Sequence, residues 1–121
     1  MADVQLQRRP PHFGLSLVAD ERSVRLEGVE GVSRFAVRGD AGAASRIGQA
    51  FGAALPVEPW RSATNGPRAA LWLGPDEWLL LAEGGDPDAI SADVRTAMGD
   101  QPFSWVDISH RNAGLLLSGP H

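Results

Sequence analysis

The chain has 121 residues, with eleven basic and fifteen acidic side chains and a formal net charge of −4. All eleven basic residues are arginines, and neither lysine nor cysteine occurs. The missing thiol excludes disulfides, thiolate nucleophiles, iron–sulfur clusters and cysteine-ligated zinc, and the missing lysine excludes Schiff-base chemistry and P-loop phosphate binding. Dispersed arginines in an acidic chain argue against a nucleic-acid surface, which needs a clustered basic patch.

The length suits a single domain, and the hydrophobic content of 43% is ordinary for a globular protein. No apolar run approaches the roughly 18 residues that a membrane-spanning helix needs. Residues 1–7 are polar and lack the apolar core of a secretory signal, so we expect a cytoplasmic protein. Residues 1–30 show no sustained hydrophobic period. We expect an N-terminal arm there, either partly disordered or ordered by contact with a partner.

The first regular elements are a strand and a helix. Residues 32–38 alternate in polarity and stop at Gly39-Asp40, which predicts a strand followed by a helix that Asp40 caps. The helix should end between Gly52 and Pro56. Its apolar stripe is expected to comprise Ala44, Ile47, Phe51 and Leu55, widened by Ala43, Ala50 and Ala54. Residues 56–67 follow as a loop that closes in the turn-prone sequence Asn65-Gly66-Pro67.

The centre of the chain is an apolar hairpin. Gly74-Pro75-Asp76-Glu77 favours a tight turn, because proline presets φ at its second position, so residues 68–74 and 77–83 are predicted as antiparallel strands. Leu71 and Leu73 share one face of the first strand. Residues 78–82 are apolar without alternation, which is typical of a strand covered on both faces. We therefore expect the hairpin to lie in the middle of the sheet.

The carboxyl-terminal third completes the expected fold. Asp86-Pro87 predicts a second helix that Gly99 closes, with a buried stripe of Ile90, Val94, Ala97 and Met98. Residues 103–109 and 113–118 predict two strands joined through 110–112. Strand, helix, strand, strand, helix, strand, with one added strand, is the order of a ferredoxin-like split βαβ unit. We expect an α+β domain over residues 31–121, with a mainly antiparallel sheet and both helices on one face.

A short internal repeat extends this picture. Residues 35–40 lead from a strand into a helix start, and residues 115–120 repeat the apolar run that ends at a glycine. We expect from this repeat that residues 31–121 form the first half of a longer two-unit protein.

Few residues are grouped in a way that indicates catalysis. His12, His110 and His121 are too far apart in sequence for a helical metal pair, so no metal site is expected. Asp107, Ser109 and His110 are the residue types of a nucleophilic triad, but along a strand the histidine points away from the other two. We expect His110 and Arg111 to form a turn whose polar groups bind neighbouring backbone or a partner.

The residues at the hairpin turn have two interpretations. Trp72 and Trp78 flank the turn, and buried aromatic residues are mostly core residues, so a core role is favoured over a stacking platform for a planar ligand. The adjacent acids Asp76 and Glu77 lie at the tip, where solvation disfavours a general acid–base role.

Four motifs together resemble the gamma subunit of heterotetrameric sarcosine oxidase. They are Arg38-Gly39-Asp40 before an alanine-rich helix, the hairpin over 70–81, and the segments 106–111 and 115–121. The resemblance covers residues 32–121, and the hairpin is its most specific part. The Asp-x-Ser-His-Arg and Ser-Gly-Pro elements are shared more widely with the aminomethyltransferase-like folate-binding superfamily. Family members continue past the last of these elements into a second half.

The resemblance implies a non-catalytic assembly subunit in the oxidative demethylation of sarcosine to glycine, hydrogen peroxide and methylene-tetrahydrofolate. It implies alpha, beta and delta subunits as partners, with FAD, FMN, NAD and tetrahydrofolate bound there and no cofactor in this chain. Trp72, Trp78, His110 and Arg111 are then structural or subunit-contact residues, and no catalytic residue is assigned. The alternative is a folate-binding module in which Trp72 or Trp78 stacks on the pteridine and Asp107 hydrogen-bonds its ring.

Overall fold

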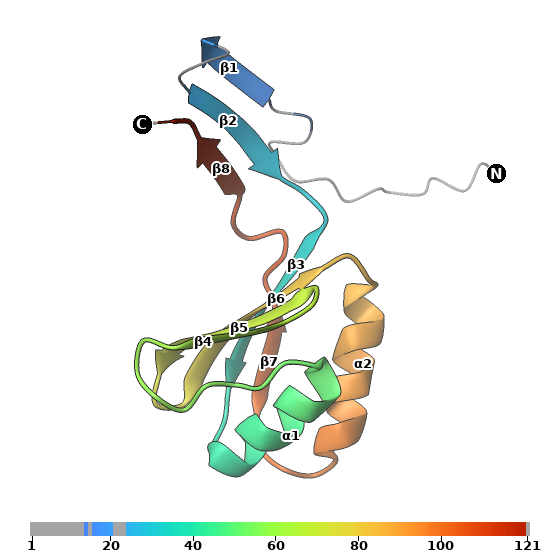
Figure 1. Cartoon of the computed structure of the whole chain (residues 1–121). Coiled ribbons are helices and arrows are strands. Elements are labelled where there is room, and N and C mark those ends of the chain that lie inside the picture. The colour runs from blue at the N-terminus through green and yellow to red at the C-terminus, as the bar shows by residue number, and fades with distance from the viewer. Residues whose placement is uncertain (1–13, 15, 21–23, 121) are drawn as a thin grey trace, which may run out of the picture. The chain divides into compact units, whose positions relative to one another are not determined.

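The computed structural model describes residues 14, 16–20 and 24–120, which form two compact units (Figure 1). One unit spans Gly31–Ser109, and the other combines Met1–Glu30 with His110–His121. The sequence predicted an arm over residues 1–30 and a domain over 31–121. The structure instead ends the larger unit at Ser109, because the following strand pairs with a strand from the first 30 residues.

The larger unit contains an antiparallel five-stranded sheet in the order β4-β5-β6-β3-β7. Its strands are β3 (Val32–Arg38), β4 (Ser62–Asn65), β5 (Arg68–Gly74), β6 (Glu77–Glu83) and β7 (Ser104–Asp107). Helices α1 (Ala41–Phe51) and α2 (Pro87–Met98) lie on one face of the sheet (Figure 1). Without β4, the order is that of the ferredoxin-like split βαβ unit, so the predicted α+β class is confirmed. The hairpin also lies mid-sheet, with β6 as the central strand.

Local chemistry sets the ends of both helices. The Asp40 carboxylate accepts a hydrogen bond from the Ala43 amide over 2.7 Å, and Gly52 ends α1 in the left-handed conformation at φ 93°. In α2, Asp86 accepts from the Asp88 amide over 3.0 Å. These are the predicted caps. Neither helix in the described part of the chain is long and apolar enough to cross a membrane.

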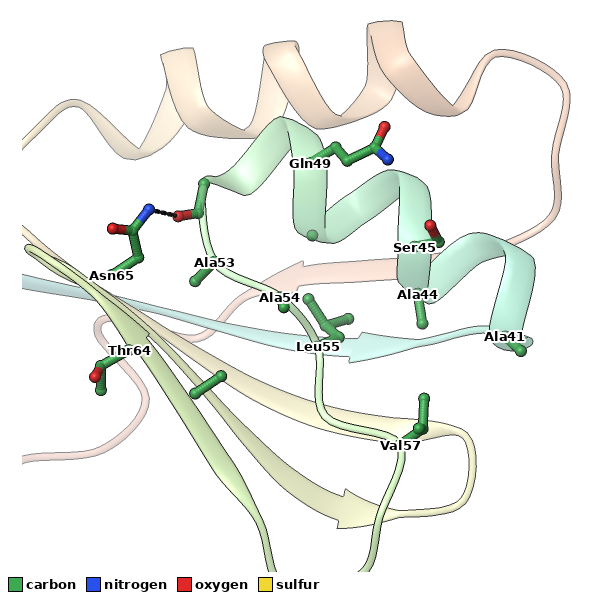
Figure 2. A pocket seen from close by; sticks show the side chains of 13 residues that line it. Ala41, Ala44, Ser45, Gln49, Ala53, Ala54, Leu55, Val57, Thr64 and Asn65 are labelled. Atoms are coloured by element: carbon green, nitrogen blue, oxygen red, sulfur yellow. Dashed lines mark hydrogen bonds between the residues drawn. The ribbon is translucent and has the colours of Figure 1, made fainter.

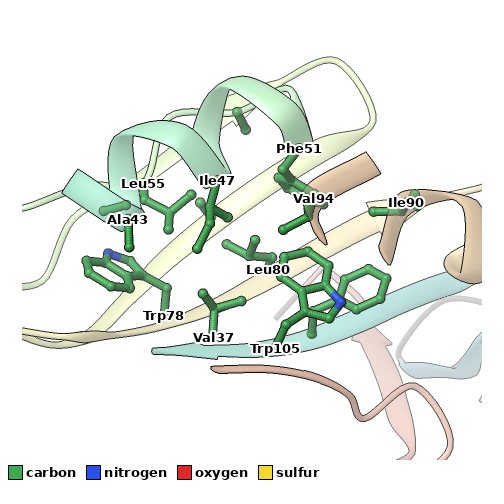
Figure 3. Close-up of a cluster of buried hydrophobic side chains, with 14 of the residues drawn as sticks. Val37, Ala43, Ile47, Phe51, Leu55, Trp78, Leu80, Ile90, Val94 and Trp105 are labelled. Carbon is green, nitrogen blue, oxygen red and sulfur yellow. The ribbon is translucent and has the colours of Figure 1, made fainter. Parts of the chain in front are cut away.

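The core lies between the helices and the sheet (Figure 3). Phe35 stacks on Trp105 with ring centroids 4.6 Å apart, and Phe51 meets both rings edge-on. Within α2, Ile90, Val94 and Met98 are buried as predicted, whereas Ala97 is exposed. Ala54 is also exposed, because α1 has already ended at Phe51.

The prediction that β6 is covered on both faces is wrong for the described residues. Trp78, Leu80 and Ala82 are buried beneath the helices, and the alternate residues Leu79 and Leu81 are only half-buried. Leu71 pairs with Leu79 on the helix-free face, whereas Leu73 lies where the register of β5 and β6 shifts, between Trp72 and Gly74, so alternation no longer sets its face. The unbroken apolar run in β6 therefore gives the strand two apolar faces, and the helices cover one of them.

The smaller unit contains a sheet that the sequence did not predict. Strands β1 (Ser16–Asp20), β2 (Val24–Val29) and β8 (Gly114–Ser118) form an antiparallel sheet in the order β1-β2-β8. The predicted arm thus includes two strands, and its other residues lie outside the described ones except Gly14 and Glu30. Its regular structure was missed because β2 pairs with β8, which follows about 90 residues later in the chain.

Candidate functional site

Trp78, on β6, occupies the core. Its side chain is 1% exposed, and its indole Nε1 donates a hydrogen bond to the Pro56 carbonyl oxygen over 2.7 Å. A ring packed in this way has no open face for a ligand. This position favours the core role over the stacking role that the sequence left open.

Trp72, on β5, lies opposite Trp78 in the strand register and is half-buried. Its ring centroid is 5.7 Å from that of Trp60, with the two planes at 57°. A planar ligand between two parallel rings needs about 7 Å, twice the contact distance of carbon atoms, so this pair has no slot for one. The Trp72 Nε1 atom is buried and has no hydrogen-bond partner among the described residues.

Asp107 and Ser109 close the end of β7. The Ser109 amide donates to the Asp107 carboxylate over 2.9 Å, and the Ser109 hydroxyl donates to the same oxygen. That hydroxyl oxygen also accepts from the Arg34 amide over 3.0 Å, which ties this turn to β3. Ser109 is therefore engaged in joining two segments of backbone, and its oxygen is not free to act as a nucleophile.

The structure does not bring Asp107 beside the two tryptophans proposed with it as folate contacts. Asp107, on β7, pairs with Phe35 along one edge of β3. Trp78, on β6, pairs with Val37 along the opposite edge of that strand. A full strand thus separates the carboxylate from β6, and two strands separate it from β5.

The remaining polar candidates are dispersed. His110 and Arg111 are exposed, and His12 and His121 lie outside the described residues. At the hairpin tip, the Glu77 carboxylate forms an ion pair with Arg38 at 2.8 Å. Among the described residues, no group of three or more histidine, cysteine or acidic side chains is placed to hold a metal ion.

A groove of about 660 Å³ runs beside α1 and is lined almost entirely by small, uncharged residues (Figure 2). A side chain at Gly48 would meet the Ala53 carbonyl oxygen at 3.1 Å, so glycine allows the chain after α1 to pass close to the helix. Asn65 fixes the end of the groove by donating to the Gly52 carbonyl oxygen over 2.8 Å. The lining is Ala41, Ala44, Ser45, Gly48, Gln49, Gly52, Ala53, Ala54, Leu55, Val57, Ala63, Thr64 and Asn65.

Trp60, to which the sequence patterns assign no role, is 89% exposed and is the most exposed large apolar residue described. It belongs to the segment Pro56–Arg61, here called the Trp60 loop. One signal in the sequence could have drawn attention to it, the dipeptide Pro59-Trp60 within a predicted loop. After proline at the second position of a type II turn, glycine or asparagine is expected at the third, so tryptophan there is unusual.

Comparison with known proteins identifies the family. The family model described as the sarcosine oxidase gamma subunit family matches residues 36–121. This chain belongs to that family. The resemblance inferred from the hairpin and the 106–111 and 115–121 segments is thereby confirmed.

Individual relatives agree with this assignment. Sarcosine oxidase subunit gamma of Corynebacterium sp. (strain U-96) is 33% identical over 124 residues, which cover 96% of this chain and 60% of the relative. The corresponding subunits of Corynebacterium sp. (strain P-1) and Arthrobacter sp. are each 39% identical over 87 residues, or 70% of this chain and 41% of theirs. This chain therefore spans 41–60% of the length of these relatives.

The fold is also that of a solved relative. A chain of the heterotetrameric sarcosine oxidase from Corynebacterium sp. U-96, solved in complex with pyrrole 2-carboxylate, matches with a TM-score of 0.79 and 34% identity. The match covers 93% of this chain and 62% of that one.

Proposed function

We propose that this gamma-family protein is a non-catalytic subunit of a heterotetrameric sarcosine oxidase, with a role in assembly. Such a complex oxidises sarcosine to glycine, reduces oxygen to hydrogen peroxide and passes the methyl carbon to tetrahydrofolate as methylene-tetrahydrofolate. The single observation that carries the proposal is the agreement of fold and sequence with a chain of a heterotetrameric sarcosine oxidase, at 34% identity over 93% of this chain.

The state of the candidate reactive groups supports an assembly role. The Asp107 carboxylate accepts from Ser109, whose hydroxyl oxygen accepts from the Arg34 amide of β3, and Glu77 is paired with Arg38. These contacts stabilise turns and strand pairing. We therefore propose that FAD, FMN, NAD and tetrahydrofolate are bound by the alpha, beta and delta subunits, and that the complex is cytoplasmic, as the sequence predicts.

Co-expression with the candidate large subunits tests this proposal. A tagged gamma-family chain should co-purify with them in fixed stoichiometry, and the purified complex should carry flavin absorbance and produce peroxide with sarcosine. The tagged chain purified by itself should show neither property. Elution of this chain alone in the presence of the other subunits would refute the assembly role.

A folate titration separates the assembly role from the alternative of a folate-binding module. With folate raised to millimolar concentration, we expect the tryptophan fluorescence of the isolated chain to stay unquenched after correction for absorption. Saturable quenching that a Trp72→Phe variant abolishes would favour the folate-binding module instead.

A further inference from the structure

The Trp60 loop contains a turn whose residues do not suit its backbone. Glu58-Pro59-Trp60-Arg61 has proline at the second position and a positive φ of 63° at the third. A positive φ at that position is typical of a type II turn, which favours glycine there because a side chain is strained in this region. Trp60 is the one residue other than glycine with a positive φ in the described part of the chain.

Interactions on both sides hold this loop in place. The Pro56 carbonyl oxygen accepts from the buried Trp78 indole over 2.7 Å, and the Arg61 carbonyl oxygen accepts from the Trp72 amide over 3.0 Å. Glu58 and Arg61 form an ion pair at 3.4 Å across the turn. The turn is therefore anchored to the core at its base, while the indole of Trp60 projects outward.

Packing within the described structure does not account for a tryptophan at this position. Trp60 is 89% exposed, and its ring contact is the tilted approach to Trp72. Val57, in the same loop, is a second exposed apolar side chain, at 69%. Trp60 therefore combines a strained backbone conformation with an indole whose burial does not stabilise the fold. Residues that are unfavourable for folding in this way are typical of functional positions.

A small-molecule platform is the weaker explanation. The Trp60 and Trp72 rings are too close and too tilted to hold a planar ring between them. Binding sites for small molecules also use several convergent polar groups to fix orientation, whereas Glu58 and Arg61 are paired with each other. An exposed indole on a held loop, with a polar rim, instead fits a protein interface, where tryptophan is enriched among the residues that dominate affinity.

We propose that Trp60 is an anchor that inserts, with Val57 of the same loop beside it in sequence, into an apolar pocket on another subunit of the complex. This inference rests on the proposed assembly role, and a partner other than a second copy is favoured because the matching solved relative is heterotetrameric. The partner's pocket should be sized for an indole and offer an acceptor to its Nε1–H group. Because the loop is already held, binding orders few additional residues.

Variants that accept a positive φ separate an anchor from a structural residue. Trp60→Gly and Trp60→Asn suit the backbone of the turn, so the melting temperature of the chain should stay unchanged or rise. Their affinity for the large subunits should fall about thirtyfold or more, as expected for a central interface tryptophan. Trp60→Phe should recover part of the affinity. Leu116→Asn, at an equally apolar site that is 54% exposed on β8, is the matched control and should bind normally.

Photo-crosslinking from position 60 identifies the occupant. A photoreactive phenylalanine derivative there should link to a large subunit, and the same group at position 116 should give no such product. Crosslinks only to a second copy of this chain would overturn the proposal. Normal assembly of both Trp60 variants alongside the unchanged protein would overturn the anchor alone, whereas failure of the unchanged protein to assemble would overturn the assembly role as well.

Discussion

Both units of this chain contain a sheet with an apolar face, but among the described residues only one of these faces is covered within its own unit. In the larger unit, Phe35 and Leu80 pair across β3 and β6 and are both fully buried under the helices. In the smaller unit, Leu17, Leu26 and Leu117 form a comparable row across β1, β2 and β8. There Leu17 is 57% and Leu117 is 68% exposed.

The difference shows what alternation along a strand does and does not determine. A two-residue period decides which side chains share a face, and it does so equally well in both sheets. Whether that face is buried depends on a second layer, which α1 and α2 supply to the larger unit alone among the described residues. We therefore expect the free energy of unfolding to depend mainly on the helix-covered core.

The largest effect is expected at the centre of that core. Trp78→Ala should lower the free energy of unfolding by about 3–5 kcal/mol, because it removes a fully packed indole and leaves a cavity. Trp78→Phe retains most of the volume but leaves the Pro56 carbonyl oxygen without its donor, and should cost about 1–3 kcal/mol. Urea unfolding followed by circular dichroism measures both. A melting temperature unchanged by Trp78→Ala would show that the ring is exposed in solution.

A matched pair of leucines tests the comparison directly. Leu80→Ala should cost about 2–5 kcal/mol, since Leu80 is fully buried. Leu117→Ala removes the same atoms from a side chain that is 68% exposed, and should change stability by no more than about 0.5 kcal/mol. Equal losses in urea unfolding would mean that a further layer covers β8 in solution. Hydrogen exchange should agree, with slower exchange for the β6 amides than for those of β8.

Much of the larger unit was predictable because its signals are local. Asp40 and Gly52 mark the two ends of α1, and Asp86 and Gly99 mark those of α2. Each of these residues acts within one turn of its own helix. The central hairpin followed from proline and glycine at its turn. The four-residue strand β4 lies at a sheet edge and has no apolar pattern, so its sequence predicts a loop. Strands β1 and β2 depend on pairing with a distant segment, which no local window can detect.

The candidate site was less predictable than the fold. The sequence disfavours a triad of Asp107, Ser109 and His110, but the bond of the Ser109 hydroxyl to the backbone of Arg34 requires the β3–β7 pairing to be known. Trp60 was overlooked because its exposure depends on how the Trp60 loop is held by Trp72 and Trp78. Composition places four tryptophans in this chain, and only the tertiary structure separates the exposed one from the others.

An intermediate effect is expected where a polar group enters the core. Ser91 is 6% exposed, and its hydroxyl accepts from the Trp105 indole over 3.0 Å while donating to the Pro87 carbonyl oxygen. Ser91→Ala should cost about 1–3 kcal/mol, because the buried Trp105 Nε1 atom then lacks an acceptor. Ser45→Ala, on the exposed side of α1, should be neutral or slightly stabilising through helix propensity. If both variants melt like the unchanged protein, the Trp105 indole must find another acceptor.

The smallest effect compares two ion pairs, one in each unit, with nearly equal exposure. Arg38 and Glu77 lie 2.8 Å apart across β3 and β6, whereas Arg25 and Glu27 lie 3.6 Å apart on β2 alone. Arg38→Ala should cost at most about 1 kcal/mol, and Arg25→Ala should cost close to nothing, because only the first pair joins separate strands of a folded core. Roughly 1 M salt should remove most of the difference by screening. A larger loss for Arg25→Ala would mean that the three-stranded sheet contributes more to stability than its uncovered leucines indicate.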